Sequence, residues 1–133
     1  MIRDANRTAK RARHLRFHLI VQRVVDSLPD TVQELLEEIA IVVQDEPDAH
    51  QRLESELDDN DELFGLYQGI PQTERTSGYS MVVPDRITIF IGPIERACTS
   101  RRELEWEIRT TVLHELGHHL GYGEAGLEKL GLS

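Results

Sequence analysis

The sequence has few of the features that mark secreted or membrane proteins. Its 133 residues include a single cysteine, Cys98, so the chain can form no internal disulfide and offers no cysteine cluster for zinc. No apolar run approaches the roughly 18 residues of a membrane-spanning helix. The stretch "FHLIVQRVV" is interrupted by His18, Gln22 and Arg23, which is atypical of a signal peptide. We expect a cytoplasmic protein that does not contact membranes.

Internal repeats, low-complexity tracts and linkers rich in Pro, Gly and Ser are also lacking. Hydrophobic residues make up 39% of the chain and charged residues 29%, which is typical of a globular domain that buries a core. These features predict a single domain over residues 17–133. Residues 1–16 are expected to form a basic, partly disordered arm.

Positive charge is scarce outside this arm. The chain carries a net charge of −9, yet the arm holds six of the fifteen basic residues and only one acid, so the rest has 9 basic against 23 acidic residues. An acidic body repels phosphates, which argues against a broad nucleic-acid-binding face. The arm alone could contact nucleic acid, although a solvated leader is the simpler interpretation. Nothing in the composition indicates an oligomeric state.

Local patterns predict both helices and strands. Residues 17–28 place apolar side chains at helical spacing, and Pro29 marks the end of that helix. A short helical turn then leads into a strand over residues 39–44. The acidic segment that follows is expected on the surface, with one short helix or turn. Two further strands, residues 79–83 and 86–91, are expected to form a hairpin, so the patterns predict an α+β fold.

The last long element is a helix that begins in "SRRE". The Ser100 hydroxyl can cap it, while Glu103 reaches back to the Ser100 backbone N–H. Helix formers continue to Leu120, and Gly121 can adopt the left-handed conformation that ends a helix. At about 100° per residue, the face expected in the core holds Leu104, Ile108, Val112, Leu113, Leu116 and Leu120.

His114 and His118 fall opposite this face, at about 200° and 240° from Val112. Their i, i+4 spacing stacks the imidazoles one turn apart, so both can bind one zinc ion at about 2.0 to 2.1 Å per nitrogen. Glu115 points about 60° to 100° away from the pair and can lie beside the activated water as a general base. His119, at about 340°, lies on the apolar face, so we expect it in the core or supporting the site.

A turn at Gly121 would let Glu124 supply a carboxylate oxygen as the third protein ligand, which leaves a fourth position for water. Three protein ligands and one open position are typical of catalytic zinc sites. Tyr122 could donate a hydrogen bond to the tetrahedral intermediate, but an aromatic residue beside a helix end more often serves packing. His-Glu-x-x-His alone arises by chance in many helices. The helix cap, the placement away from the core, Gly121 and Glu124 make the signal specific.

The stretch "HELGHHLGYGE" resembles the H-E-x-x-H-x-x-G-x-x-D/E pattern of the minimal zincin-like metallopeptidase family of small bacterial proteins. The segments "VVQDEP", "LFGLYQGIPQTERT", "PDRITIFIGPI" and "RTTVLHELGHHLG" resemble family members in the same order. The resemblance implies that His114 and His118 are zinc ligands and that Glu115 is the catalytic base. It implies a third ligand at position 124, where the family typically has Asp. Glu124 is one methylene longer, which affects the coordination geometry.

The resemblance also implies a minimal zincin-like fold, in which a small mixed sheet packs against the motif-bearing helix and an N-terminal helix. The strand at residues 86–91 would run beside the cleft and pair with an extended peptide, whereas a packed inner strand is the alternative. The Met-turn of the related metzincins is absent, because Met1 and Met81 both precede the motif.

Three functions are compatible with these residues. The first is a zinc-dependent peptidase acting on peptides or flexible protein segments, with one zinc ion, three protein ligands and a water, and with Glu115 as general base. The second is a zincin-like metal-binding protein that acts through a partner without peptidase activity. The third is a metal-dependent endoribonuclease. Small bacterial rRNA-maturation endoribonucleases carry H-x-x-x-H-x-x-x-x-x-H and a similar "GY", but Glu115, Glu124 and the acidic body disfavour this function.

Overall fold

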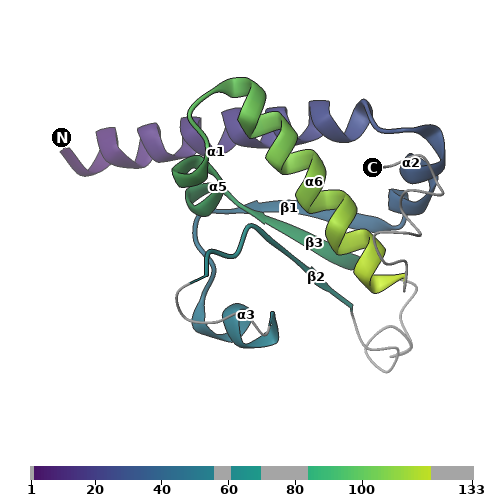
Figure 1. Cartoon of the computed structure of the whole chain (residues 1–133). Helices are drawn as coiled ribbons and strands as arrows, with labels where there is room; N and C mark the ends of the chain where they lie inside the picture. Colours follow the sequence, from purple (N-terminus) through teal and green to yellow (C-terminus); the bar gives the residue numbers. More distant parts are fainter. Residues whose placement is uncertain (1, 56–60, 70–83, 121–133) are drawn as a thin grey trace, which may run out of the picture.

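Two long helices cover one face of a small β-sheet (Figure 1). The computed structural model describes residues 2–55, 61–69 and 84–120, in which these helices are α1 (Ile2–Asp26) and α6 (Arg101–His119). The described residues also form three short helices, α2 (Asp30–Leu36), α3 (Ala49–Glu54) and α5 (Ile91–Ala97). The fold is therefore α+β, as the sequence predicts. No helix in these three stretches is long and apolar enough to cross a membrane.

The sheet contains strands β1 (Ile39–Gln44), β2 (Gly65–Gln68) and β3 (Asp85–Phe90) in the order β1-β3-β2. β1 runs parallel to β3, whereas β2 is antiparallel to it. β3 is consequently the central strand, and its residues 87–90 are all buried. The predicted bounds of β1 are confirmed. The strand predicted at residues 86–91 is present as β3, one residue earlier, and its two neighbours in the sheet are β1 and β2. The other strand of the expected hairpin, residues 79–83, lies outside the described residues.

The edge strand β2 is absent from the sequence prediction. It has only four residues, and Gly65 and Gly69 bracket it. Glycine is depleted in strands and favours turns, so the local pattern indicates a surface segment there. Pairing with β3 at Leu66 and Tyr67 overrides this local preference. The short helix expected in the same acidic region is present as α3.

The main core lies between the sheet and the helices α1, α2 and α6. Ile87 and Ile89 of β3 face it, whereas Phe90 faces the other side and packs with Leu63 and Leu66. Along α1 the buried side chains recur every three or four residues, as in an amphipathic helix packed on a core. The residues of α1, α2 and α6 buried in the core are Phe17, Val21, Val24, Val32, Leu36, Ile108, Val112, Leu113 and Leu116.

Helix α1 is longer than predicted. The periodic pattern indicates a helix from residue 17, whereas α1 begins at Ile2 and includes most of the basic segment. Arg13 connects this segment to the body: its guanidinium donates to Asp45 at 2.6 Å and to Glu95 at 2.9 Å. Such pairing of the basic segment with acidic groups on distant elements is not visible in local sequence patterns.

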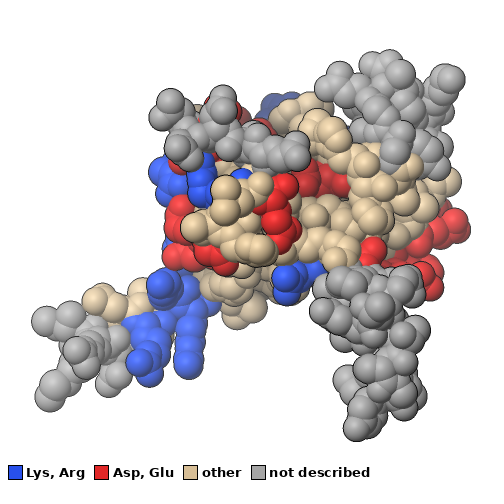
Figure 2. Space-filling model, turned by 90° about the horizontal axis from the view of Figure 1, so that it is seen from below, with Lys and Arg blue, Asp and Glu red and all other residues tan. Residues whose placement is uncertain are grey.

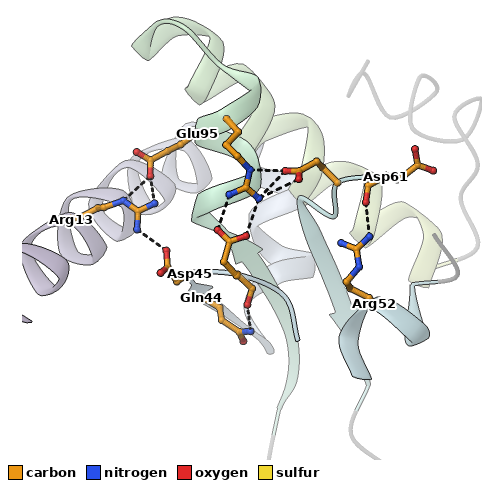
Figure 3. Close-up of polar contacts among 9 residues, drawn as sticks. Arg13, Gln44, Asp45, Arg52, Asp61 and Glu95 are labelled. Atoms are coloured by element: carbon orange, nitrogen blue, oxygen red, sulfur yellow. Dashed lines mark hydrogen bonds and ion pairs between the residues drawn. The ribbon is translucent and has the colours of Figure 1, made fainter. Parts of the chain in front are cut away.

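A second arginine, Arg96 of α5, binds carboxylates close to the contacts of Arg13 with Asp45 and Glu95, which are labelled in Figure 3. It makes two hydrogen bonds of 2.9 Å with Glu46, which follows β1, and it pairs with Glu62, just before β2, at 3.0 Å. The Gly92 N–H of α5 also donates to the Asp45 carbonyl at 2.9 Å. These contacts fix α5, an element that the sequence patterns did not predict, against the ends of two strands.

Candidate metal centre

Helix α6 holds the motif residues, and its N-terminus is capped. The Ser100 hydroxyl accepts a hydrogen bond from the Glu103 N–H at 3.1 Å, as predicted. The Glu103 carboxylate accepts from the Thr99 N–H at 2.8 Å, one residue before the expected Ser100 N–H. Ile108, Val112, Leu113 and Leu116 are buried along one side of the helix. Leu120 is 39% exposed and lies outside the core, contrary to the wheel. The buried side sets the rotation of α6 about its axis.

The rotation of α6 turns His114 and His118 toward solvent. Both side chains are exposed, and their Nε2 atoms lie 2.9 Å apart. Their ring centroids are 4.4 Å apart with the planes at 71°. Two imidazole nitrogens bound to one tetrahedral zinc ion at about 2.0 to 2.1 Å lie roughly 3.3 Å apart. The converging pair therefore fits a zinc ion after a small adjustment of the side chains.

The third predicted ligand, Glu124, lies outside the described residues, as do Gly121 and Tyr122. Among residues 2–55, 61–69 and 84–120, no three His, Cys, Asp or Glu side chains are grouped to hold a metal ion. A metal site that included His114 and His118 would thus need a further ligand from outside these residues. The role of Glu124 as third ligand stays a prediction.

Glu115 points away from the histidine pair and toward the sheet. Its side chain is partly buried, and its Oε1 accepts a hydrogen bond of 2.9 Å from the backbone N–H of Tyr67 in β2. The divergence from the two histidines agrees with the helical wheel. The hydrogen-bond partner of Glu115 does not follow from the wheel, because Tyr67 lies 48 residues away in the sequence.

His119 lies outside the core, which was one of the two places expected for it. Its side chain is 41% exposed rather than in the core. Its ring stacks on Tyr67 with centroids 3.8 Å apart and planes at 10°, and its Nε2 lies 3.7 Å from Asp85 Oδ2. The Tyr67 hydroxyl donates to the same oxygen at 2.7 Å. Of the two places expected for His119, the core is therefore wrong, and a place supporting the site stays a prediction.

Tyr67 and Asp85 were not among the candidate site residues. Tyr67 lies in the glycine-bracketed segment expected to be a surface turn, and Asp85 sits at the start of a strand. The one signal that includes both is the family resemblance of "LFGLYQGIPQTERT" and "PDRITIFIGPI", which assigns neither of them a role.

A cleft of about 640 Å³ runs between β2 and the outer side of α6. The helix contributes Thr110, Thr111 and the three motif residues, and the opposite wall is largely apolar. The described lining residues include three glutamates and neither Lys nor Arg. The full lining is Glu54, Ser55, Leu63, Phe64, Gly65, Leu66, Glu107, Thr110, Thr111, His114, Glu115 and His118.

The strand beside this cleft is β2, not the strand at residues 86–91 that the resemblance implies. β3 pairs with β1 on one side and with β2 on the other, so the packed inner strand is the correct alternative. The Phe90 N–H donates to the Phe64 carbonyl at 2.9 Å, which shows which residue pairs of β2 and β3 are hydrogen-bonded. Hydrogen-bonded and non-hydrogen-bonded pairs alternate along an antiparallel ladder. The backbone N–H and C=O groups of Gly65 and Tyr67 therefore point away from β3, toward the outer edge of β2.

β2 approaches α6 closely at Gly65. A Cβ atom added there would lie 2.5 Å from Thr111 Cγ2 and 3.0 Å from the Thr88 carbonyl oxygen. Glycine is therefore required at position 65 because a larger residue would clash with its neighbours, not because of its backbone conformation. This close approach brings the outer edge of β2 within reach of the motif helix.

The single cysteine offers no alternative nucleophile. Cys98 is partly buried next to α5, and this burial raises the pKa of its thiol. The carboxylates of Glu107 and Glu103 raise that pKa further. The reactive thiolate is consequently disfavoured at neutral pH.

The sequence matches the family model described as zincin-like metallopeptidase over residues 36–132. Among solved structures, it is similar to a conserved hypothetical protein from Thermus thermophilus, with a TM-score of 0.52 and 21% sequence identity. That similarity covers 81% of this chain and 94% of the other, and it shows a shared fold. No curated protein matches the sequence.

Proposed function

We propose that this chain, which belongs to the zincin-like metallopeptidase family, is a zinc-dependent peptidase that cleaves peptides or flexible protein segments. The observation that carries the proposal is the arrangement on α6. His114 and His118 converge within 2.9 Å on the exposed side of the helix, and Glu115 between them in sequence reaches the edge of the sheet. All three line one cleft.

In this proposal His114, His118 and Glu124 hold a single zinc ion. Bound zinc supplies Lewis-acid chemistry: it polarises a carbonyl and lowers the pKa of a water molecule. Glu115 accepts the proton of the attacking water and later passes it to the leaving amine. Because Oε1 of Glu115 is engaged by the Tyr67 N–H, we assign the proton transfer to Oε2.

The cleft favours a peptide over RNA as substrate. Its described lining carries three carboxylates and no cation that could neutralise a phosphate. The outward backbone groups of Gly65 offer hydrogen bonds to an extended chain, which supports addition of the substrate as a further strand at the β2 edge. Leu63, Phe64 and Leu66 supply apolar surface for its side chains.

Metal analysis of the purified protein, combined with digestion of a diverse peptide library read by mass spectrometry, tests the proposal. We expect one zinc ion per chain and cleavage that a chelator abolishes and added zinc restores. Glu115→Gln should retain zinc and lose at least about 100-fold in kcat, because general-base catalysis contributes about 10²- to 10⁴-fold.

Two outcomes would favour the other functions. A zinc-loaded protein that leaves the whole library intact points to a metal-binding protein that acts through a partner. Cleavage of single-stranded RNA that disappears in His118→Ala points to an endoribonuclease.

A further inference from the structure

Among the described residues, Tyr67 contacts three side chains through three different chemical groups. Its backbone N–H donates to Glu115 Oε1 at 2.9 Å. Its ring stacks on His119 at 3.8 Å, and its hydroxyl donates to Asp85 Oδ2 at 2.7 Å. One residue of the edge strand is thus joined to the end of α6 and to the start of the central strand.

The two contacts on α6 lie one helical turn apart. Glu115 and His119 are at i and i+4, so they present adjacent surfaces on the same side of the helix. A single hydrogen bond would leave the Glu115 side chain free to pivot. Stacking one turn further along fixes β2 against this side of α6, which also fixes the direction from which the Tyr67 N–H approaches the carboxylate.

Asp85 restrains the ring from the opposite end. Its side chain is only 18% exposed, and its Oδ2 lies within reach of both the Tyr67 hydroxyl and His119 Nε2. The phenol is therefore held at its hydroxyl end by Asp85 and at its face by His119. Rotation of the ring, or sliding of β2 along α6, would break at least one of these contacts.

We propose that Tyr67 is a positioning residue, which, with Asp85 and His119, holds the Glu115 carboxylate in the orientation that proton transfer requires. The inference rests on the proposed function, in which Glu115 is the general base. Tyr67 acts through Glu115 and does not bind the metal. Its removal should therefore lower kcat and leave KM and zinc content unchanged, since displacement of a catalytic group by about 1 Å can cost about 100-fold in rate.

Steady-state kinetics on one peptide cleaved in the library separates the contributions. Tyr67→Phe removes only the hydroxyl contact, and we expect kcat to fall about 3- to 10-fold. Tyr67→Leu also removes the stacked ring, and we expect a fall of about 100-fold with KM within about twofold. Trp106→Leu, a matched loss of an exposed aromatic residue on α6, should leave kcat unchanged.

A double-mutant cycle tests whether the hydroxyl acts through Asp85. If it does, Tyr67→Phe combined with Asp85→Ala should lower kcat no further than Asp85→Ala alone. Asp85→Asn keeps an acceptor oxygen and should restore most of the rate. Multiplying effects in the double variant, or a Tyr67→Leu protein with the wild-type kcat, would overturn the proposal.

Amide exchange measured by NMR on the zinc-free protein tests the contact without any activity. The amide hydrogen of residue 67 should exchange slowly in the wild-type chain and faster in Glu115→Ala and Tyr67→Leu. If the wild-type chain cleaves no peptide, the proposed peptidase function fails. The exchange measurement still shows whether the Tyr67 N–H is bonded to Glu115. Equal exchange in the wild type and in Glu115→Ala would overturn the positioning role of Tyr67.

Discussion

At the scale of single residues, the proposed metal centre depends on two histidines whose exposure is set by the buried side of α6. His114 and His118 each supply one nitrogen to the proposed zinc ion, and neither side chain is needed for the core. We expect His114→Ala or His118→Ala to weaken zinc binding by more than about 100-fold, because only two protein ligands would remain. Competition with a chromogenic chelator measures this affinity.

His50→Ala is the matched control for this measurement. His50 is an exposed histidine on α3 that pairs with Glu54 at 2.8 Å. We expect its replacement to leave zinc affinity unchanged. If all three alanine variants bind zinc like the wild type, the assignment of the two α6 histidines as ligands is wrong.

Gly65 determines how closely the edge strand approaches the motif helix. A methyl group there would meet Thr111 and the Thr88 carbonyl oxygen, so we expect Gly65→Ala to lower the free energy of unfolding by about 1 to 3 kcal/mol. Urea unfolding measures this change. Adding Thr111→Ser, which removes the clashing methyl, should recover part of the loss.

Gly69→Ala provides the comparison for Gly65. The nearest atom to an added Cβ there is Asp85 Oδ1 at 3.9 Å, an ordinary contact distance. We expect a change within about 0.5 kcal/mol. Equal effects at the two glycines would mean that the close approach of β2 to α6 does not constrain the fold.

At the scale of elements, ion pairs join α1 and α5 to the ends of the strands (Figure 3). The hydrogen bond from Arg13 holds the pKa of Asp45 below its ordinary value of 3.8, and that from Arg96 holds the pKa of Glu46 below 4.5. A carboxylate with a lowered folded-state pKa contributes stability above its ordinary pKa. That contribution is lost as the pH falls through the lowered value.

We therefore expect the wild-type chain to lose stability as the pH falls below about 4. Arg13→Met should lose less than about 1 kcal/mol at neutral pH, because the pair is half-exposed and screened by solvent. Its stability should also vary less with pH in the acid range and with salt. Urea unfolding at neutral and acid pH, at low and high salt, measures both effects.

Arg11→Met is the control for Arg13→Met. Arg11 lies on the same helix and is exposed. We expect it to leave both the stability and its pH dependence unchanged. Identical pH profiles for wild type and Arg13→Met would show that the pair adds nothing to folding.

At the scale of the whole molecule, charge is divided between the N-terminal end of α1 and the body. Figure 2 shows blue Lys and Arg side chains on the projecting end of this helix, whereas the visible body carries several red acidic patches and smaller blue ones. The acidic lining of the cleft belongs to the second part. This division supports a cleft that takes peptides and leaves α1 as the region able to contact polyanions.

The proposed zinc ion should also stabilise the whole fold, because its two histidine ligands converge only in the native α6. At a free zinc concentration of about 100 times the dissociation constant, linkage predicts a gain of about 2.7 kcal/mol. We expect the unfolding midpoint to rise with zinc and to fall with chelator. Thermal unfolding of the wild type with and without zinc measures this, and His118→Ala should show no dependence.

The sequence alone determined the parts of this protein that depend on local periodicity and capping. The helical spacing and Ser100 predicted α6, and with it the outward direction of His114 and His118. The β-branched run predicted β1, because such side chains favour strands over a short window. The motif and its flanking segments also indicated the family, which the family model confirms.

Only the tertiary structure decided which segments meet. The pairing of β2 with β3, the contact of Tyr67 with Glu115 and the exposure of His119 join residues far apart in the chain. The periodicity of a sequence shows which side of a helix or strand is apolar. It does not show which element packs against that side or how closely the two approach. The environment of Glu115 was therefore fixed by packing at Gly65 and Tyr67, whereas its place on the helix was fixed by sequence.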